Sequence, residues 1–317
     1  MNYYLGIDVG SVSTKIIYVD DDCNVLETLY MRTHGNPLKS VQSGLKQIQI
    51  RFPATAKIAG VGITGSARYL IAAMVNADII KNEITAHAVA GIHFCPQIQT
   101  IIEIGGQDSK IIIIRNGIVM DFAMNNVCAA GTGSFLDQQA VRLGIPIDEF
   151  GGRALEAKND VGIAGRCTVF AESDMVHKQQ LGYSLNDIIN GLCEALVRNY
   201  INSVGKGKEI KHPILFLGGV AANIGIRKAF QKSFGKEIII PKHFNVMGAI
   251  GSAILAKEYR EKTNNTTKFK GFELTDLQFE TTSFTCTDCP NHCEVVEFWE
   301  EDKKIAFFGD KCGKYAG

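Results

Sequence analysis

Residues 7–15 read Ile-Asp-Val-Gly-Ser-Val-Ser-Thr-Lys, and residues 102–110 read Ile-Glu-Ile-Gly-Gly-Gln-Asp-Ser-Lys. The two nonamers share an acidic residue, a glycine, a hydroxyl residue and a lysine at equivalent places. β-rich runs flank both, at 3–7 and 16–19 and at 100–104 and 111–114. Such runs around a polar, glycine-containing turn predict β-hairpins. The chain therefore carries two related hairpin units, and duplication of an α/β fold is the simplest interpretation.

The remaining patterns predict two α/β halves and a small appendage. We expect residues 1–96 to form the first half, with a helix over 244–262 packing back on it, and residues 97–243 to form the second. Apolar residues at helical spacing from Leu185 to Val204, after Ser184, predict a capped helix in the second half. A polar, Thr/Asn-rich start predicts a linker over 263–280. Residues 281–317 form a cysteine-dense tail.

Composition narrows the class of protein. The 317 residues include 33 Lys and Arg and 33 Asp and Glu, so the formal charge is zero. A nucleic-acid or membrane-surface protein is expected to carry a basic excess. The start of the chain lacks a basic, apolar signal segment, and no apolar run reaches the ~18 residues of a membrane span. We therefore expect a cytoplasmic protein, in which nine cysteines indicate metal or redox chemistry before disulfides.

Both nonamers carry candidate phosphate ligands. In the first, a glycine lets the backbone approach an anion, and hydroxyls and a lysine add hydrogen-bond donors. The aspartate is placed to hold Mg²⁺ through water. In that order, these residues are Gly10; Ser11, Ser13 and Thr14; Lys15; and Asp8. The second offers a facing clamp through Gly105, Gly106, Gln107, Asp108, Ser109 and Lys110. Alone, either turn could be an ordinary hairpin. A third segment, Leu217-Gly218-Gly219-Val-Ala-Ala-Asn223, ends a strand with two glycines, as contact with adenine or ribose requires.

The ordered triple resembles the phosphate 1, phosphate 2 and adenosine motifs of the actin/Hsp70/sugar-kinase (ribonuclease H-like) fold over residues 1–260. The match narrows at Asn82-Glu83-Ile-Thr85-Ala-His87, at Asn125-Asn-Val-Cys128-Ala-Ala-Gly131-Thr-Gly133-Ser-Phe and at Gly165-Arg-Cys167-Thr-Val-Phe-Ala-Glu172-Ser. These segments resemble the BadF/BadG/BcrA/BcrD-type ATPases. That family includes activators of 2-hydroxyacyl-CoA dehydratases, benzoyl-CoA reductase subunits and reductases of double-cubane-cluster proteins.

The resemblance implies a homodimer in which Cys128 and Cys167 of two subunits hold one [4Fe–4S] cluster. It implies that ATP hydrolysis drives one-electron transfer from that cluster to a partner iron–sulfur enzyme, with ferredoxin or flavodoxin as donor. ATP or ADP and Mg²⁺ would be held at the motifs above. Asp8 would hold the metal, Gln107 or Asp108 would position water, and Glu83 is a further candidate although it also fits a helix cap. The electron acceptor stays open.

Physical chemistry supports the two cysteines as ligands. A cubane cluster needs four thiolates, two segments supply two, and an anionic cluster is favoured at a helix N-terminus. The alternative is that both are small buried residues, which free cysteines often are. We assign no role to Cys23, Cys95 or Cys193.

The tail has a second cysteine set with ligand-like spacing, Cys286-x2-Cys289-x3-Cys293-x18-Cys312. A second [4Fe–4S] cluster and a structural Zn²⁺ site both fit. The cluster is favoured here because the chain resembles an electron-transfer protein. His292 could replace one cysteine, although its place between ligands favours an exposed loop residue.

Two rival functions follow from the same motifs. A small-molecule, sugar-type kinase of the same fold explains the nucleotide motifs but not Cys128 and Cys167. A nucleotide-gated interaction protein with structural zinc explains the cysteines without electron transfer. Iron and sulfide content separates both from a reductive activator.

Overall fold

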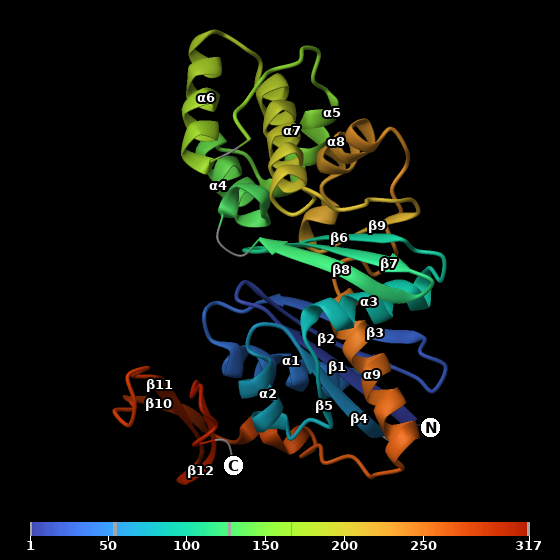
Figure 1. The fold of residues 1–317 in the computed structure, drawn as a ribbon, viewed down its shortest axis with the longest axis vertical. Coiled ribbons are helices and arrows are strands. Elements are labelled where there is room, and N and C mark those ends of the chain that lie inside the picture. The colour runs from blue at the N-terminus through green and yellow to red at the C-terminus, as the bar shows by residue number, and fades with distance from the viewer. Residues whose placement is uncertain (1, 53–55, 126–127, 166, 316–317) are drawn as a thin grey trace. The chain divides into compact units, whose positions relative to one another are not determined.

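A computed structural model of the chain describes residues 2–52, 56–125, 128–165 and 167–315. The chain divides into two compact units, which we treat separately (Figure 1). Unit 1 comprises residues 1–89 and 248–317, and unit 2 comprises residues 90–247. The tail at 281–317 therefore belongs to unit 1.

Unit 1 is built on a five-stranded sheet of order β3-β2-β1-β4-β5. Its strands are β1 (Asn2–Val9), β2 (Ser13–Val19), β3 (Val25–Arg32), β4 (Lys57–Thr64) and β5 (Ile79–Ile80). Its helices are α1 (Pro37–Arg51), α2 (Arg68–Val75), the start of α3 (Glu83–Phe94) and α9 (Met247–Thr263). Strand glycines let α9 lie directly on this sheet, since an ideal Cβ on Gly6 would sit 1.9 Å from the Ala249 carbonyl oxygen.

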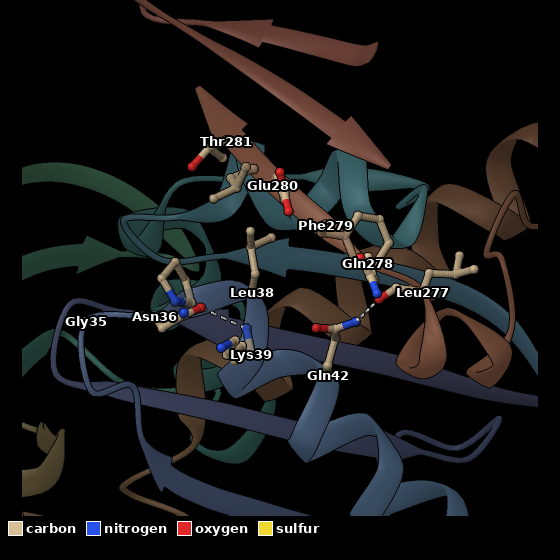
Figure 2. Close-up of a pocket in the computed structure, with 12 residues that line it drawn as sticks. Gly35, Asn36, Leu38, Lys39, Gln42, Leu277, Gln278, Phe279, Glu280 and Thr281 are labelled. Atoms are coloured by element: carbon tan, nitrogen blue, oxygen red, sulfur yellow. Dashed lines mark hydrogen bonds between the residues drawn. The ribbon is translucent and has the colours of Figure 1, made fainter. Parts of the chain in front are cut away.

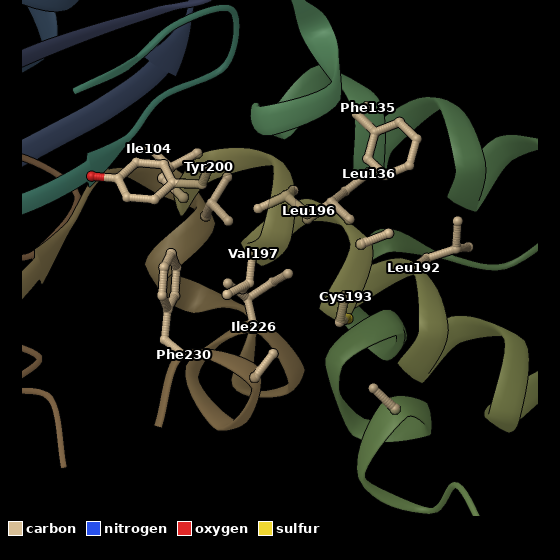
Figure 3. Packing of buried hydrophobic residues seen from close by; sticks show 14 of the residues in the cluster. Ile104, Phe135, Leu136, Leu192, Cys193, Leu196, Val197, Tyr200, Ile226 and Phe230 are labelled. Atoms are coloured by element: carbon tan, nitrogen blue, oxygen red, sulfur yellow. The ribbon is translucent and has the colours of Figure 1, made fainter. Parts of the chain in front are cut away.

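Unit 2 repeats the plan with a four-stranded sheet of order β8-β7-β6-β9. Its strands are β6 (Thr100–Ile104), β7 (Ser109–Arg115), β8 (Ile118–Asn125) and β9 (Ile214–Leu217). Its helical elements are η1 (Ala129–Gly131), α4 (Gly133–Leu143), α5 (Ile147–Leu155), α6 (Thr168–Gln180), α7 (Leu185–Ser203), η2 (Gly219–Ala222) and α8 (Ile224–Phe234). The apolar face of α7 lies at the centre of the core (Figure 3). Ser184 caps α7 by accepting from the Asp187 N–H, as the sequence predicts.

The duplication predicted from the nonamers is present in the strand registers. Asp8 of β1 lies opposite Lys15 of β2, and Glu103 of β6 lies opposite Lys110 of β7. In both units the hairpin is antiparallel and the first strand pairs in parallel with a later strand, β4 or β9. The expected duplicated α/β fold is confirmed.

The tail forms a third, antiparallel sheet of order β10-β11-β12, with strands β10 (Phe279–Thr285), β11 (Glu294–Glu300) and β12 (Lys303–Phe308). Phe298 of β11 is fully buried in the same apolar core as Leu5 and Ile7. The tail is therefore part of the unit 1 core.

The segment expected to be a linker, 263–280, is held on unit 1 instead of spanning open solvent. It contains η3 (Phe272–Asp276), whose Leu274 is buried in the unit 1 core. The Gln42 side chain on α1 donates to the carbonyl of Leu277 at 2.8 Å. Figure 2 shows this bond beside a pocket of about 530 Å³ between the start of α1 and β10. The polar composition of residues 263–280 could not reveal that this segment attaches to unit 1, because Leu274 and Leu277 are far from α1 along the sequence.

Among the described residues, no helix combines the length and apolar character needed to cross a bilayer.

Candidate functional site

The first turn closes tightly and presents a small polar surface. The Gly10 N–H donates to the Ser13 carbonyl at 3.0 Å. Lys15 Nζ lies 3.1 Å from Asp8 Oδ2, with 16% of the lysine side chain exposed. Ser11 is exposed at the tip. This turn therefore offers backbone N–H groups, one hydroxyl and one partly exposed cation to an anionic ligand.

Two hydroxyls assigned to phosphate contact are buried instead. Ser13 is buried, and Thr14 is fully buried with its hydroxyl 3.0 Å from that of Thr33. The Thr33 hydroxyl donates to the Gly10 carbonyl at 2.9 Å. Because β2 begins at Ser13, both residues already follow the strand pleat. Thr14 therefore supports the turn from within, through a partner that sequence analysis missed.

The second turn is closed by the same kind of backbone hydrogen bond as the first, but its lysine has different ion-pair partners. The Gly105 N–H donates to the Asp108 carbonyl at 3.0 Å. Lys110 Nζ lies 3.0 Å from Glu103 Oε2 and 2.9 Å from Asp108 Oδ2, and only 2% of its side chain is exposed. Lys110 is thus a buried counter-ion for two carboxylates, whereas part of the Lys15 side chain is exposed.

The tip of the second turn is accessible, and the rest of it is not. Gln107 is exposed and Asp108 is half-buried, so both can reach solvent. The Ser109 hydroxyl is fully buried, and within the described chain it has no hydrogen-bond partner. Gln107 and Asp108 thus remain candidates for water positioning, while Ser109 and Lys110 lie beneath the turn.

The third motif begins where β9 ends. Gly218 has φ +88°, and an ideal Cβ there would lie 2.3 Å from the Ile104 carbonyl oxygen, so only glycine fits beside β6. Gly219 is exposed at the start of η2. Asn223 caps α8, its side chain accepting from the Ile226 N–H at 3.1 Å. This motif therefore presents glycine backbone at Gly219, with Asn223 as a helix cap.

His87 joins the surroundings of Asp8, a role that sequence analysis missed. An ideal Cβ on Gly248 would lie 2.8 Å from Asp8 Oδ2 and 3.3 Å from His87 Cε1, so the carboxylate and the ring flank one point at the start of α9. His87 Nδ1 lies 2.8 Å from the carbonyl oxygen of Glu83, one turn earlier on α3. The sequence carries no local signal for this neighbourhood, because Asp8, His87 and Gly248 are far apart along the chain.

Cys128 and Cys167 both lie in unit 2 and are half-buried. Cys167 is the N-cap of α6, as predicted. Cys128 precedes the short 3-10 turn η1, and α4 begins only at Gly133, so Cys128 is not at the start of an α-helix. Asn125 fixes its backbone, accepting from the Cys128 N–H at 3.0 Å and donating to the Cys128 carbonyl at 2.9 Å.

Asn199 on α7 connects the two cysteine segments. Its Nδ2 donates to the Gly165 carbonyl at 2.6 Å, two residues before Cys167. An ideal Cβ on Gly131, three residues after Cys128, would lie 2.8 Å from Asn199 Oδ1. The asparagine is 7% exposed, and within the described chain Oδ1 has no hydrogen-bond partner. One buried amide therefore contacts both segments.

The glycine-rich sequence after Cys128 serves a contact with the second phosphate turn. The Gly133 N–H donates to the Gly105 carbonyl at 2.9 Å. The Ser134 N–H and hydroxyl donate to the Gly106 carbonyl at 2.8 and 2.6 Å. These bonds join the start of α4 to the turn that carries Gln107.

The remaining cysteines divide by burial. Full burial raises the pKa of the Cys193 thiol well above its usual range, and burial also raises the pKa of Cys23. Cys95 is half-buried. In the tail, Cys286 is buried, Cys289 and Cys293 are half-buried and Cys312 is exposed. Across the described residues, no three Cys, His, Asp or Glu side chains are already gathered as a metal site.

The model of the BadF/BadG/BcrA/BcrD ATPase family matches residues 5–256. The chain belongs to this family. The 2-hydroxyisocaproyl-CoA dehydratase activator of Clostridioides difficile is 32% identical over 272 residues, which cover 83% of this chain and 99% of that protein. The match to the family stops before the tail.

Solved structures agree with this assignment. The crystal structure of the Acidaminococcus fermentans (R)-2-hydroxyglutaryl-CoA dehydratase component A has a TM-score of 0.74 at 31% identity, covering 81% of this chain and 98% of that one. The activator of the 2-hydroxyisocaproyl-CoA dehydratase from Clostridium difficile with bound ADPNP has a TM-score of 0.74 at 29% identity, covering 85% and 100%. The actin/Hsp70/sugar-kinase fold and membership of an ATPase family are thus confirmed for this chain.

Proposed function

We propose that this BadF/BadG/BcrA/BcrD-type ATPase is the reductive activator of a partner iron–sulfur enzyme. ATP hydrolysis would drive one-electron transfer to a 2-hydroxyacyl-CoA dehydratase or a related double-cubane protein. The names of two relatives support this class of partner. One is a 2-hydroxyisocaproyl-CoA dehydratase activator and the other is component A of an (R)-2-hydroxyglutaryl-CoA dehydratase, and the matches cover 99% and 98% of their lengths.

One observation carries the proposal. The second phosphate turn is hydrogen-bonded directly to the start of α4, through Gly133 and Ser134. Cys128 lies five residues before that helix start, on the same short connection. A change in the Gly105–Gly106 backbone on nucleotide binding or hydrolysis therefore reaches the Cys128 segment without crossing the core.

The residues present fit a cluster shared between two copies. Cys128 and Cys167 are half-buried and both precede helical turns, with no side-chain capping bond from either thiol. The Asn199 side chain lies against both cysteine segments, at Gly131 and at Gly165. A [4Fe–4S] cluster bound there would supply a one-electron carrier and requires four thiolates. Two thiolates from each of two subunits meet that number, so we propose a homodimer.

The nucleotide residues take roles that follow from their exposure. Lys15 and the N–H groups around Gly10 would contact phosphate oxygens, and Asp8 would hold Mg²⁺ through water. Gln107, at the exposed tip, would orient the attacking water, with Asp108 as the alternative. Gly219 would lie against the adenosine. ATP and ADP can shift the Cys128 segment only if they stabilise different arrangements of the second turn.

Anaerobic purification tests the proposal. We expect about four iron and four sulfide per two chains, a dimer in solution, and ATPase activity. Cys128→Ala or Cys167→Ala should remove iron and dimer together, whereas Cys95→Ala, at a half-buried cysteine away from these segments, should retain both. A colourless, iron-free protein that phosphorylates a sugar would instead identify a kinase. Reduced ferredoxin or flavodoxin serves as the electron source, and anaerobic pull-down identifies the acceptor.

A further inference from the structure

The tail sheet places two of its cysteines directly opposite each other. Cys286 follows β10 and Cys293 precedes β11, continuing the register in which Thr285 pairs with Glu294. The Cys286 N–H donates to the Cys293 carbonyl at 2.8 Å. Opposed residues of an antiparallel pair point to the same face, with Cβ atoms about 4.5–5.5 Å apart. The two sulfurs therefore start on one side of the hairpin.

Cys289 lies in the loop that joins these two positions. The His292 N–H donates to the Cys289 carbonyl at 3.2 Å, which closes a tight turn over Pro290 and Asn291. His292 has φ +43°, as this sharp return requires. Three cysteines thus belong to one short hairpin loop.

The segment after β12 brings Cys312 to the same end of the sheet. Gly309 has φ +99°, and an ideal Cβ there would lie 2.4 Å from the Glu294 carbonyl oxygen, so the chain leaves β12 beside the start of β11. Tyr315 then returns to the hairpin, its hydroxyl 3.9 Å from Cys286 Sγ and its ring 5.5 Å from that of Phe284. Lys314 also forms an ion pair with Asp288 in the hairpin loop.

We infer that Cys286, Cys289, Cys293 and Cys312 bind one thiophilic divalent ion of the Zn²⁺ class as a closed tetrathiolate site. Zn–S bonds of about 2.3 Å in a tetrahedron place sulfurs about 3.8 Å apart. The cross-strand spacing of Cys286 and Cys293 reaches this distance with small side-chain movement. In a cubane each thiolate binds a different iron, so the sulfurs lie farther apart. The geometry thus favours a single ion over the cluster that sequence analysis favoured.

Metal binding at this site must draw two segments together. The Cys286 thiol lies 3.5 Å from Asp288 Oδ2, and Cys312 is exposed in its turn. Ligation would replace the thiol contacts of Cys286 by metal–thiolate bonds and fix the 309–315 turn to the hairpin loop. The site shares no residue with the proposed cluster site in unit 2, so it goes beyond the proposed function.

Metal analysis of the full chain tests the inference, using a Cys128→Ala, Cys167→Ala protein to exclude iron held by those residues. We expect about one zinc per chain in that protein, and about one Co²⁺ per chain with the visible bands of tetrahedral thiolate ligation. Adding Cys286→Ser and Cys293→Ser should abolish both signals, whereas adding Cys95→Ser should leave them unchanged. Cobalt titration of the unsubstituted chain after zinc removal measures metal binding without depending on whether a cysteine variant folds.

Two results would overturn the inference. About four iron and four sulfide per chain in the Cys128→Ala, Cys167→Ala protein would assign a cluster to the tail. Absence of both zinc and stoichiometric cobalt binding in the unsubstituted chain would show that the tail cysteines hold no ion. Failure of the proposed function has a different signature, because zinc would persist in a protein that lacks iron, dimer and electron transfer.

Discussion

At the scale of single residues, two lysines at matching positions have different surroundings. Asp108 occupies the place in its nonamer that Ser13 occupies in the first, and this extra carboxylate encloses Lys110. Lys15 pairs with Asp8 and keeps part of its side chain exposed. The difference between Ser13 and Asp108 therefore makes Lys110 a structural residue, whereas Lys15 remains a candidate for ligand binding.

We predict that Lys110→Met destabilises the protein far more than Lys15→Met. Removing Lys110 breaks its buried ion pair with Glu103, and breaking a buried pair costs roughly 3–5 kcal/mol. Lys15→Met should lower ATPase activity with a smaller loss of stability. Urea unfolding and ATP hydrolysis measure the two effects. Equal destabilisation by both substitutions would contradict the assignment.

Asn199→Ala should reduce iron content while leaving ATP binding intact. The Gly165 carbonyl would lose its donor, and an unsatisfied buried group costs about 1–3 kcal/mol. The Cys128 and Cys167 segments would lose their shared contact. Iron per chain, measured beside nucleotide affinity, tests this. Asn190→Ala on the same helix is the matched control, and equal iron loss in both would show that α7 alone is being destabilised.

Cysteine labelling should follow burial. Because burial raises the pKa of Cys193, its reactive thiolate is scarce at pH 8, and we expect no alkylation before unfolding. Cys128 and Cys167 should label readily in cluster-free protein and become protected once a cluster is bound. Mass spectrometry of alkylated peptides reports all three. Labelling of native Cys193 at the rate of Cys167 would contradict the structure.

At the scale of elements, the proposed link between nucleotide and cluster depends on the contact between the start of α4 and the Gly105–Gly106 turn. Ser134→Ala removes the hydroxyl bond to the Gly106 carbonyl, which is worth about 0.5–1.5 kcal/mol. We therefore expect the stimulation of electron transfer by ATP to fall about two- to twelve-fold, with iron content retained. Ser173→Ala, which removes a hydroxyl bond within α6, is the control. Undiminished stimulation in Ser134→Ala would exclude this route.

The sequence predicted elements well where the signal was local. The nonamers predicted both hairpins, because β-rich runs flank a short polar turn in each. The Asp8–Lys15 and Glu103–Lys110 registers come from the structure. The contacts that organise the site are non-local. Asn199 reaches Gly165 across 34 positions, and no periodicity marks one polar residue on an apolar helix face as a bridge. Burial of Thr14 likewise depends on Thr33, which lies beyond the hairpin itself.

At the scale of the whole molecule, the tail and unit 1 share one core. We predict that Phe298→Ala destabilises unit 1 as well as the tail, by about 3–5 kcal/mol, because Phe298 is buried with Leu5 and Ile7. Hydrogen exchange at β1 amides should accelerate together with exchange at β11. Acceleration confined to β11 would show that the tail opens independently.

If the tail cysteines bind an ion as we infer, the burial of Phe298 would also link the supply of that metal to the amount of folded enzyme. A ligand that binds only the folded form stabilises it by mass action, by about 2.7 kcal/mol at a hundred times its dissociation constant. If the tail opens together with the β1 strand, an ion captured by four tail thiolates raises the folded population of the half that carries Asp8 and Lys15. Limitation of this trace metal would then lower the abundance of working ATPase through turnover of unfolded chains, although the ion lies in the tail and not at the nucleotide.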